Sequence, residues 1–202
     1  MKRILTICLL VLTSATTYAL ERGKEFKENI LASVRVVADD GGTGSGFTLD
    51  KRKVLTAGHV VKGNDKVTVT YFDENSKVVK EIRGKVKKAV EVGVFENDLG
   101  LIELEEDAPY FNKVKLGETE LGSEGYTVGG PHAETPHVVA IGTFSGMSGH
   151  WPMGMLSANS APGASGSAVF NDKHELVGVL VSGIPDVCIY FITAERIREL
   201  LK

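Results

Sequence analysis

The chain has 202 residues, of which 43% are hydrophobic and 24% are charged, and its formal net charge is −3. This composition is that of a globular protein with one domain or two small ones, and it excludes disordered and fibrous chains. No basic cluster follows the first residues, so nucleic acid is not expected as a partner.

The N-terminus has the pattern of a secretory signal over residues 1–19. Two basic residues precede an apolar run from Ile4 to Leu12, and small residues follow up to Ala19. Threonine and serine interrupt the apolar stretch before it reaches the roughly 20 residues that a membrane-spanning helix needs. We therefore expect cleavage after Ala19, a protein exported to the periplasm or the extracellular space, and no stable membrane insertion after cleavage.

Beyond the signal, the predicted elements are one short helix and many short strands. Phe26 and Ile30 lie four residues apart among charges, which favours an amphipathic helix. From Ser33 onward, runs rich in Val, Ile, Thr and Phe are separated by Gly, Asn or Asp, and this spacing indicates a sandwich or a barrel. The runs are SVRVVA, GSGFTL, KVLTA, KVTVTYF, KVVKEI, LGLIEL, GYTVGG, HVVAIGTF, GSAVF, ELVGVLVSG and VCIYFI.

Two segments depart from the strand pattern. The segment from Glu105 to Glu120 is charged and contains a proline, so it is expected to link two β halves. The closing TAERIRELLK places Ile197, Leu200 and Leu201 on one face of a predicted C-terminal helix.

The motif SAPGASGSAVF, from Ser160 to Phe170, sets a serine in a tight bend. A serine hydroxyl becomes an effective nucleophile only when a neighbouring base removes its proton, and the charged intermediate needs hydrogen-bond donors. A bend around Gly163 can aim the backbone N–H groups of Gly163 and Ser165 at one point. By itself, the motif also fits a plain β-hairpin turn.

His59 is the candidate base. KVLTAGHVV places it where an apolar strand ends in small residues, which leave room for a group to approach the imidazole. A structural histidine at a strand end is the alternative. A metal site at His132 and His137 would lack a third ligand nearby, so these are expected to be solvated loop histidines and no metal site is predicted.

A buried carboxylate that accepts the second imidazole N–H would hold the base in one tautomer. The aspartates between the candidate base and the candidate nucleophile are Asp65, Asp73, Asp98 and Asp107. Asp98 opens the apolar run of NDLGLIEL, whereas the others lie in charged turns, so Asp98 is the candidate. An aspartate that simply begins a strand is the alternative.

The chain order of histidine, aspartate and serine distinguishes the folds that host such a triad. An α/β-hydrolase would need an acid and a histidine after Ser165, and its elbow motif requires glycine where this chain has Ser167. A subtilisin order would place the acid before His59, and that fold needs a parallel sheet with helical crossovers. The order in this chain goes with two antiparallel barrels.

The sequence resembles the trypsin-like serine peptidases of chymotrypsin fold, in their compact bacterial form without a PDZ domain. The blocks that carry the resemblance are GTGSGF, VLTAGHVV, NDLGLIEL, GYTVGGP, PGASGSAVF and LVGVLVSG, in the family's order. The resemblance implies that His59 is the base, Asp98 its orienter and Ser165 the nucleophile. The N–H groups of Gly163 and Ser165 would be the oxyanion donors, and neither a metal nor an organic cofactor is expected.

The same resemblance implies an all-β chain of two antiparallel six-stranded β-barrels, with a short N-terminal helix and a C-terminal helix. The expected peptidase domain covers residues 20–202. Its parts are barrel one over 33–107, a linker over 108–120, barrel two over 121–193 and the C-terminal helix over 194–202.

The primary specificity pocket can be placed only through the resemblance. Its floor is expected near Asn159 and Ser160, and its wall at Leu180, Val181, Ser182 and Gly183. None of these residues is charged, so cleavage after small or medium uncharged residues is expected. Four residues just before the pocket either pack beneath the second barrel or form a substrate-facing rim: Met147, Trp151, Met153 and Met155.

Together these features predict an exported serine endopeptidase that acts on polypeptides through an acyl-enzyme intermediate. The alternative is a catalytically silent protein- or peptide-binding module on the same fold, because a fold alone does not guarantee activity. The sequence carries no signal for the oligomeric state or the physiological substrate.

Overall fold

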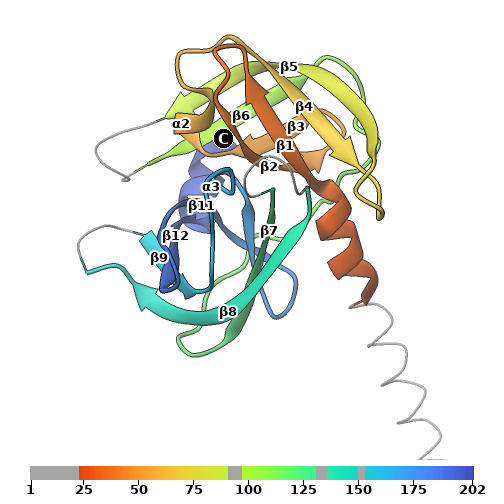
Figure 1. The fold of residues 1–202 in the computed structure, drawn as a ribbon. Coiled ribbons are helices and arrows are strands. Elements are labelled where there is room, and N and C mark those ends of the chain that lie inside the picture. The colour runs from red at the N-terminus through yellow and green to blue at the C-terminus, as the bar shows by residue number, and fades with distance from the viewer. Residues whose placement is uncertain (1–22, 91–96, 131–135, 150–152) are drawn as a thin grey trace, which may run out of the picture.

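The computed structural model describes residues 23–90, 97–130, 136–149 and 153–202. These residues form two closed β-barrels of six strands each, with one helix at residues 23–32 and another at the C-terminus (Figure 1). The predicted fold class is therefore confirmed. The predicted signal lies outside the described residues, as do His132 and Trp151.

The two barrels have the same strand order. Barrel one is closed in the order β1-β2-β3-β6-β5-β4, and barrel two in the order β7-β8-β9-β12-β11-β10. The strands of barrel one are β1 (Ser33–Ala38), β2 (Thr43–Asp50), β3 (Lys53–Thr56), β4 (Lys66–Phe72), β5 (Val78–Val90) and β6 (Leu99–Leu104). Those of barrel two are β7 (Glu124–Gly129), β8 (Val138–Met147), β9 (Met153–Ser157), β10 (Ala168–Asn171), β11 (Leu176–Ile184) and β12 (Cys188–Thr193).

Alternation along β4 shows how the sequence fills barrel one. Val67, Val69 and Tyr71 are fully buried on one face, as expected for a strand with a period of two residues. The Tyr71 hydroxyl is paired with Thr48 Oγ1 at 3.1 Å, so its polar end is satisfied inside the barrel. Burial raises the pKa of Tyr71.

Three features of the fold were not predicted from the sequence. Strand β9 and the short helix α2 (Gly58–Val61) were missed, and β5 is longer than its apolar run. Met153 of β9 is fully buried in the core, which supports the packing interpretation for this residue. Met147 is 55% exposed and does not pack beneath the barrel.

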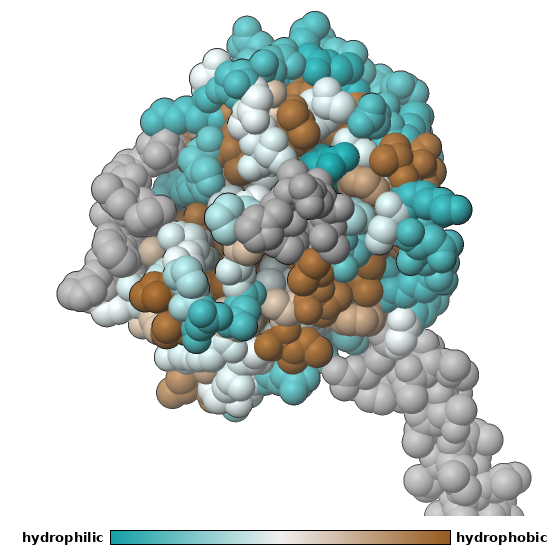
Figure 2. Space-filling model, in the orientation of Figure 1, coloured by the Kyte–Doolittle hydropathy of each residue, from teal (hydrophilic) through white to brown (hydrophobic). Residues whose placement is uncertain are grey.

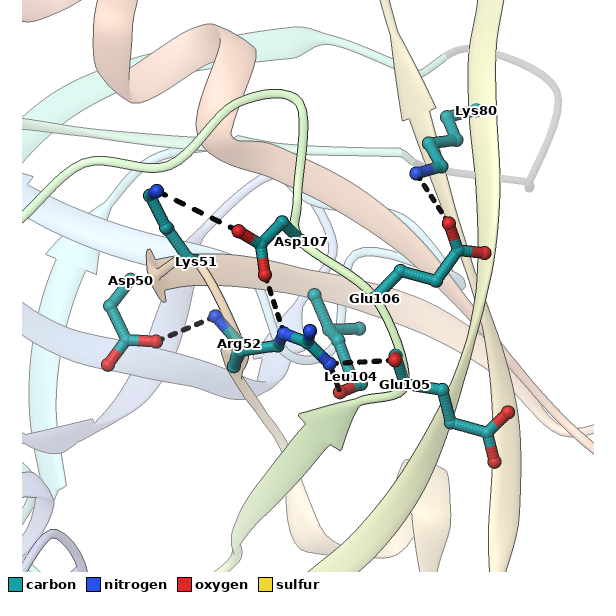
Figure 3. A network of polar contacts seen from close by, with 8 residues as sticks. All are labelled: Asp50, Lys51, Arg52, Lys80, Leu104, Glu105, Glu106 and Asp107. Atoms are coloured by element: carbon teal, nitrogen blue, oxygen red, sulfur yellow. Dashed lines mark hydrogen bonds and ion pairs between the residues drawn. The ribbon is translucent and has the colours of Figure 1, made fainter.

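The linker starts on barrel one, where Arg52 holds its first residues. The Arg52 guanidinium donates to Asp107 Oδ1 and to the Glu105 carbonyl oxygen, each at 2.7 Å (Figure 3). Further along, Leu116 forms an isolated bridge with Leu176 of β11. The segment between β6 and β7 therefore contacts barrel one near its start and barrel two near its end.

The N-terminal helix is fixed by the fully buried side chain of Asn29. Its Nδ2 donates to the Tyr126 hydroxyl at 3.0 Å, and its Oδ1 accepts from Asn112 Nδ2 at 2.8 Å. His174 Nδ1 lies 2.8 Å from the same hydroxyl, so this histidine is part of a packed cluster. The cluster joins the helix, the linker and barrel two.

The surface differs between the two barrels. In Figure 2, hydrophilic side chains cover much of barrel one, and apolar patches lie over barrel two. Barrel one also has exposed apolar side chains, among them Val78 and Val79 of β5. The exposed apolar residues of β8 include Val138 and Ile141. Among the described residues, none of the helices has the length and apolar character needed to cross a lipid bilayer.

Candidate active site

His59 lies in helix α2, directly after β3. Its Nδ1 is 2.5 Å from Asp98 Oδ2, and its backbone N–H donates to Asp98 Oδ1 at 2.7 Å. Because a carboxylate oxygen can only accept, the ring proton sits on Nδ1 and Nε2 of the neutral imidazole is an acceptor. The His59 side chain is 38% exposed and the Asp98 side chain 3%, so a buried carboxylate supports an imidazole that is open to solvent.

Gly58, directly before His59, also has a packing role that was not predicted. A Cβ on Gly58 would lie 2.5 Å from the Val90 carbonyl oxygen and 3.0 Å from Asp98 Oδ1. The space at this glycine is therefore filled by the chain and the carboxylate, and it is not open to an approaching group. Glycine is required here first because a Cβ would collide with the Val90 backbone, and a side chain would also crowd the Asp98 carboxylate.

The other candidate aspartates interact with other groups or are exposed to solvent. Asp107 forms ion pairs with Lys51 and Arg52 (Figure 3), and these cations hold its pKa below the usual range. Asp73 accepts the backbone N–H groups of Asn75 and Lys77, which likewise lower its pKa. Asp98 is the carboxylate that contacts His59.

Ser165 lies in the loop between β9 and β10, just after a tight turn. The Ala164 N–H donates to the Ala161 carbonyl oxygen at 3.1 Å, and Gly163 has a φ of 95°. A bond between the first and fourth residues with proline second and a left-handed glycine third is the pattern of a type II turn. Among the described residues, no hydrogen bond uses the N–H of Gly163 or of Ser165 as its donor.

The serine loop and helix α2 approach each other across β2. A Cβ on Gly44 would lie 2.8 Å from the Ser165 carbonyl oxygen and 2.6 Å from Val60 Cγ2, next to His59. The Ser45 N–H donates to the same Ser165 carbonyl oxygen at 2.7 Å. These contacts bring the candidate nucleophile of barrel two to the part of barrel one that carries His59.

Ser165 lines a pocket of about 260 Å³. The other lining residues are Ser160, Ala161, Pro162 and residues 180–185. Five of the six residues predicted for the specificity pocket are therefore here, and no charged side chain is among the described residues that line it. Ile184 is 48% exposed at its edge.

Asn159 is the exception among the predicted pocket residues. It lines a second, mainly apolar pocket of about 200 Å³, on the other side of Ser160 and Ala161. Val138 and Ala140 of β8 also line that pocket. Asn159 is therefore not among the described residues that line the pocket at Ser165, and its predicted place at the floor of the specificity pocket stays a prediction.

His137 is not the solvated loop histidine that was predicted. Its Nε2 is 3.2 Å from the Ser33 carbonyl oxygen, and its ring packs edge-on against Phe72. Burial lowers its pKa, although the Ser33 carbonyl and Asp73 act in the opposite direction. In the described part of the chain, no group of three or more His, Cys, Asp or Glu side chains could hold a metal ion.

Two buried serines around the loop had no predicted role. The Ser167 hydroxyl donates to the Ala164 carbonyl oxygen at 2.6 Å, and the Ser45 hydroxyl donates to the Gly163 carbonyl oxygen at 2.9 Å. The sequence signal for Ser45 is its position between two glycines in a strand, since a strand glycine often marks a close approach of another backbone.

Comparisons with known proteins agree on one family. A family model described as a trypsin-like peptidase domain matches residues 44–179, more than half of the chain. A curated relative from Hahella chejuensis (strain KCTC 2396), described as a probable periplasmic serine endoprotease, DegP-like, is 31% identical over 144 residues. That match covers 68% of this chain and 29% of the relative, so the chain spans less than a third of the relative's length.

Solved structures show the same fold. A serine endoprotease from Yersinia pestis superposes with a TM-score of 0.72 and 18% identity, covering 89% of this chain and 65% of that chain. Deg5 superposes with a TM-score of 0.68 and 21% identity, covering 90% and 92% of the two chains. At such identities the likeness establishes the architecture and leaves the chemistry to the residues of this chain.

Proposed function

Because the chain belongs to the trypsin-like peptidase family, we propose that it is a serine endopeptidase acting through Ser165, His59 and Asp98. The observation that carries the proposal is the double contact of Asp98 with His59. Gly44 lies close both to Val60, the residue after His59, and to the Ser165 carbonyl oxygen, which supports the third member. A buried carboxylate on Nδ1 leaves Nε2 as the proton acceptor, which is the arrangement that general-base activation of a serine needs.

In the proposed reaction, Ser165 Oγ attacks the carbonyl carbon of the scissile peptide bond while His59 Nε2 takes the hydroxyl proton. The carbonyl π electrons move to oxygen, and the N–H groups of Gly163 and Ser165 stabilise the oxyanion. His59 then gives the proton to the leaving amine as the C–N bond breaks. Water, deprotonated by His59, hydrolyses the acyl-enzyme and restores Ser165.

A fluorophosphonate probe tests the nucleophile directly. The wild-type protein should be labelled and should cleave a denatured test protein, and Ser165→Ala should lose both properties while remaining folded. Ser160→Ala is the matched control, since it removes a hydroxyl from the same pocket and should still be labelled. Folded wild-type protein that is neither labelled nor active would instead indicate a binding module without turnover.

The pocket supports a proposal for the substrate class. Its described lining combines apolar Leu180 and Val181 with small Ser182 and Gly183, and it offers no charge to pair with an ionic side chain. We propose cleavage after small or medium uncharged residues. Sequencing the products from a peptide library measures this preference, and a strong preference for Arg, Lys or Glu would refute it.

We also infer that the protein is exported. The support is the charged, apolar and small-residue pattern of residues 1–19, together with a relative that is described as periplasmic. N-terminal sequencing of the protein recovered from a secreting host should find Leu20 first. Recovery of the intact Met1 end inside the cell would contradict export.

A further inference from the structure

Ser45 of β2 connects the two barrels at the serine loop. It is fully buried, and its hydroxyl donates to the Gly163 carbonyl oxygen and accepts from the Gly130 N–H, both at 2.9 Å. Its backbone N–H donates to the Ser165 carbonyl oxygen at 2.7 Å. One residue of barrel one therefore holds three backbone groups of barrel two.

These contacts restrict how the backbone around Ser165 can turn. Ser45 holds the carbonyl groups of Gly163 and Ser165, and Ser167 holds that of Ala164 through its N–H at 3.0 Å and its hydroxyl at 2.6 Å. The N–H and C=O of one peptide unit point in opposite directions, so fixing a carbonyl also fixes the N–H of the next residue.

The Ser165 N–H belongs to the peptide whose carbonyl Ser167 holds. The Gly163 carbonyl that Ser45 holds shares its peptide unit with the Ala164 N–H, which closes the turn on the Ala161 carbonyl oxygen, and the Gly163 N–H lies inside that turn. Both N–H groups remain without a hydrogen bond among the described residues.

We propose that Ser45 is a positioning residue for the oxyanion donors, and this inference rests on the proposed peptidase function. Its hydroxyl anchors the Gly163–Ala164 peptide to barrel one, and barrel one also carries His59. The two N–H donors and the His59 imidazole are thereby held in position by the same strands of barrel one. Donors that are placed in advance need no reorganisation when charge develops on the substrate oxygen.

The hydroxyl group of Ser45 makes the two side-chain contacts on which the position of the turn depends. Without it, the half-buried Gly163 carbonyl and the buried Gly130 N–H would both lose their partner. The turn would then be free to rotate the Gly163 peptide toward other partners. A displacement of about 1 Å in such a site reduces the rate about 100-fold.

Kinetics of Ser45→Ala and Ser45→Cys test the proposal. Cysteine keeps the volume but replaces the hydroxyl with a weak donor, so it guards against a variant that fails to fold. We expect kcat to fall about 10- to 100-fold in both variants while KM for a peptide amide stays within about twofold. Thr48→Val is the matched control, because it removes a buried hydroxyl from the same strand that contacts Tyr71 instead of the loop.

A peptide aldehyde of the same sequence gives a readout that a purely structural role would not change. Ser165 Oγ adds to its carbonyl carbon, the π electrons move to oxygen, and the hydroxyl proton goes to His59, so the adduct places an oxyanion where the transition state does. Its affinity should fall in the Ser45 variants by the same factor as kcat/KM. In Thr48→Val it should stay at the wild-type value.

Several outcomes would overturn the proposal. Folded Ser45→Ala or Ser45→Cys with wild-type kcat and aldehyde affinity would do so, as would a rise in KM with unchanged kcat. A loss of active fraction in fluorophosphonate titration, with a wild-type rate per active site, would show that Ser45 affects stability alone. Failure of the peptidase function is seen separately, as activity that survives Ser165→Ala.

Discussion

Asp98 makes two contacts with one residue, and each has its own consequence. The contact with His59 Nδ1 sets the tautomer of the ring, and the contact with the His59 backbone N–H satisfies a donor in the first turn of α2, where Ala57 provides no side-chain cap. The side chain is 3% exposed, so water cannot replace these contacts. One buried carboxylate therefore orients the ring and the short helix that carries it.

Replacing Asp98 with asparagine should separate activity from folding. The amide keeps the shape but can present an N–H to the ring, which favours the wrong tautomer, so we expect kcat/KM to fall about 10⁴-fold. Peptide-amide kinetics and circular-dichroism melting measure the two effects. Asp107→Asn is the control, because Asp107 pairs with Arg52 in an exposed turn and should leave kcat/KM unchanged. A comparable loss in both variants would contradict the role given to Asp98.

Among the elements, β5 and the C-terminal helix α3 (Ala194–Leu200) form a further connection between the barrels. Lys88 of β5 donates from Nζ to the Leu200 carbonyl oxygen at 2.7 Å. The last carbonyl groups of a helix have no partner within the helix, and a cation there also interacts favourably with the helix dipole. A strand of barrel one thus caps the helix that follows the last strand of barrel two.

We predict that Lys88→Met lowers the free energy of unfolding by about 0.5–1 kcal/mol, because the helix end loses its cationic partner. Urea denaturation measures the change. Lys87→Met is the neighbouring control: Lys87 forms an exposed ion pair with Glu103, and such pairs contribute at most about 1 kcal/mol and often nothing measurable. The prediction is wrong if Lys88→Met is no less stable than Lys87→Met.

At the scale of the whole molecule, the barrels share an apolar core cluster, in which Phe47 of barrel one packs against Phe170 of barrel two, and further contacts join them. One set of these contacts surrounds Phe72, with the Arg35 guanidinium 5.1 Å from the ring centre and His137 of barrel two against the ring edge. His137 also reaches the Ser33 carbonyl oxygen of β1. Burial in this interface lowers the pKa of His137, so its ring stays neutral to a lower pH than that of a histidine in water.

The lowered pKa of His137 predicts how stability depends on pH. Below about pH 6.5 the unfolded chain takes up the proton before the folded chain does, so the free energy of unfolding falls as the pH decreases through this range. His137→Gln keeps a donor for Ser33 and removes the titration. Urea denaturation at about pH 8 and about pH 5.5 should therefore show a smaller loss in the variant than in the wild type. Equal losses would contradict this account.

Local patterns predicted much of this fold. Alternating apolar residues indicated most of the strands, because a strand that closes a barrel must bury every second side chain. Strand β9 was not predicted because its glycine and two methionines give a weak strand signal. Helix α2 was not predicted because four residues are too few to show the spacing of apolar residues that indicates a helix.

The sequence by itself determined which residues have the right chemistry: one histidine at a strand end, one aspartate before an apolar strand and one serine in a glycine-rich bend. Only the tertiary structure decided which of these groups meet. It brought Asp98 to His59 across 39 residues and Ser45 to Gly163 across 118, and it placed Asn159 along a neighbouring pocket. Such contacts depend on how the two barrels close and pack against each other, and a short window of sequence contains no information about the distance between segments that only folding brings together.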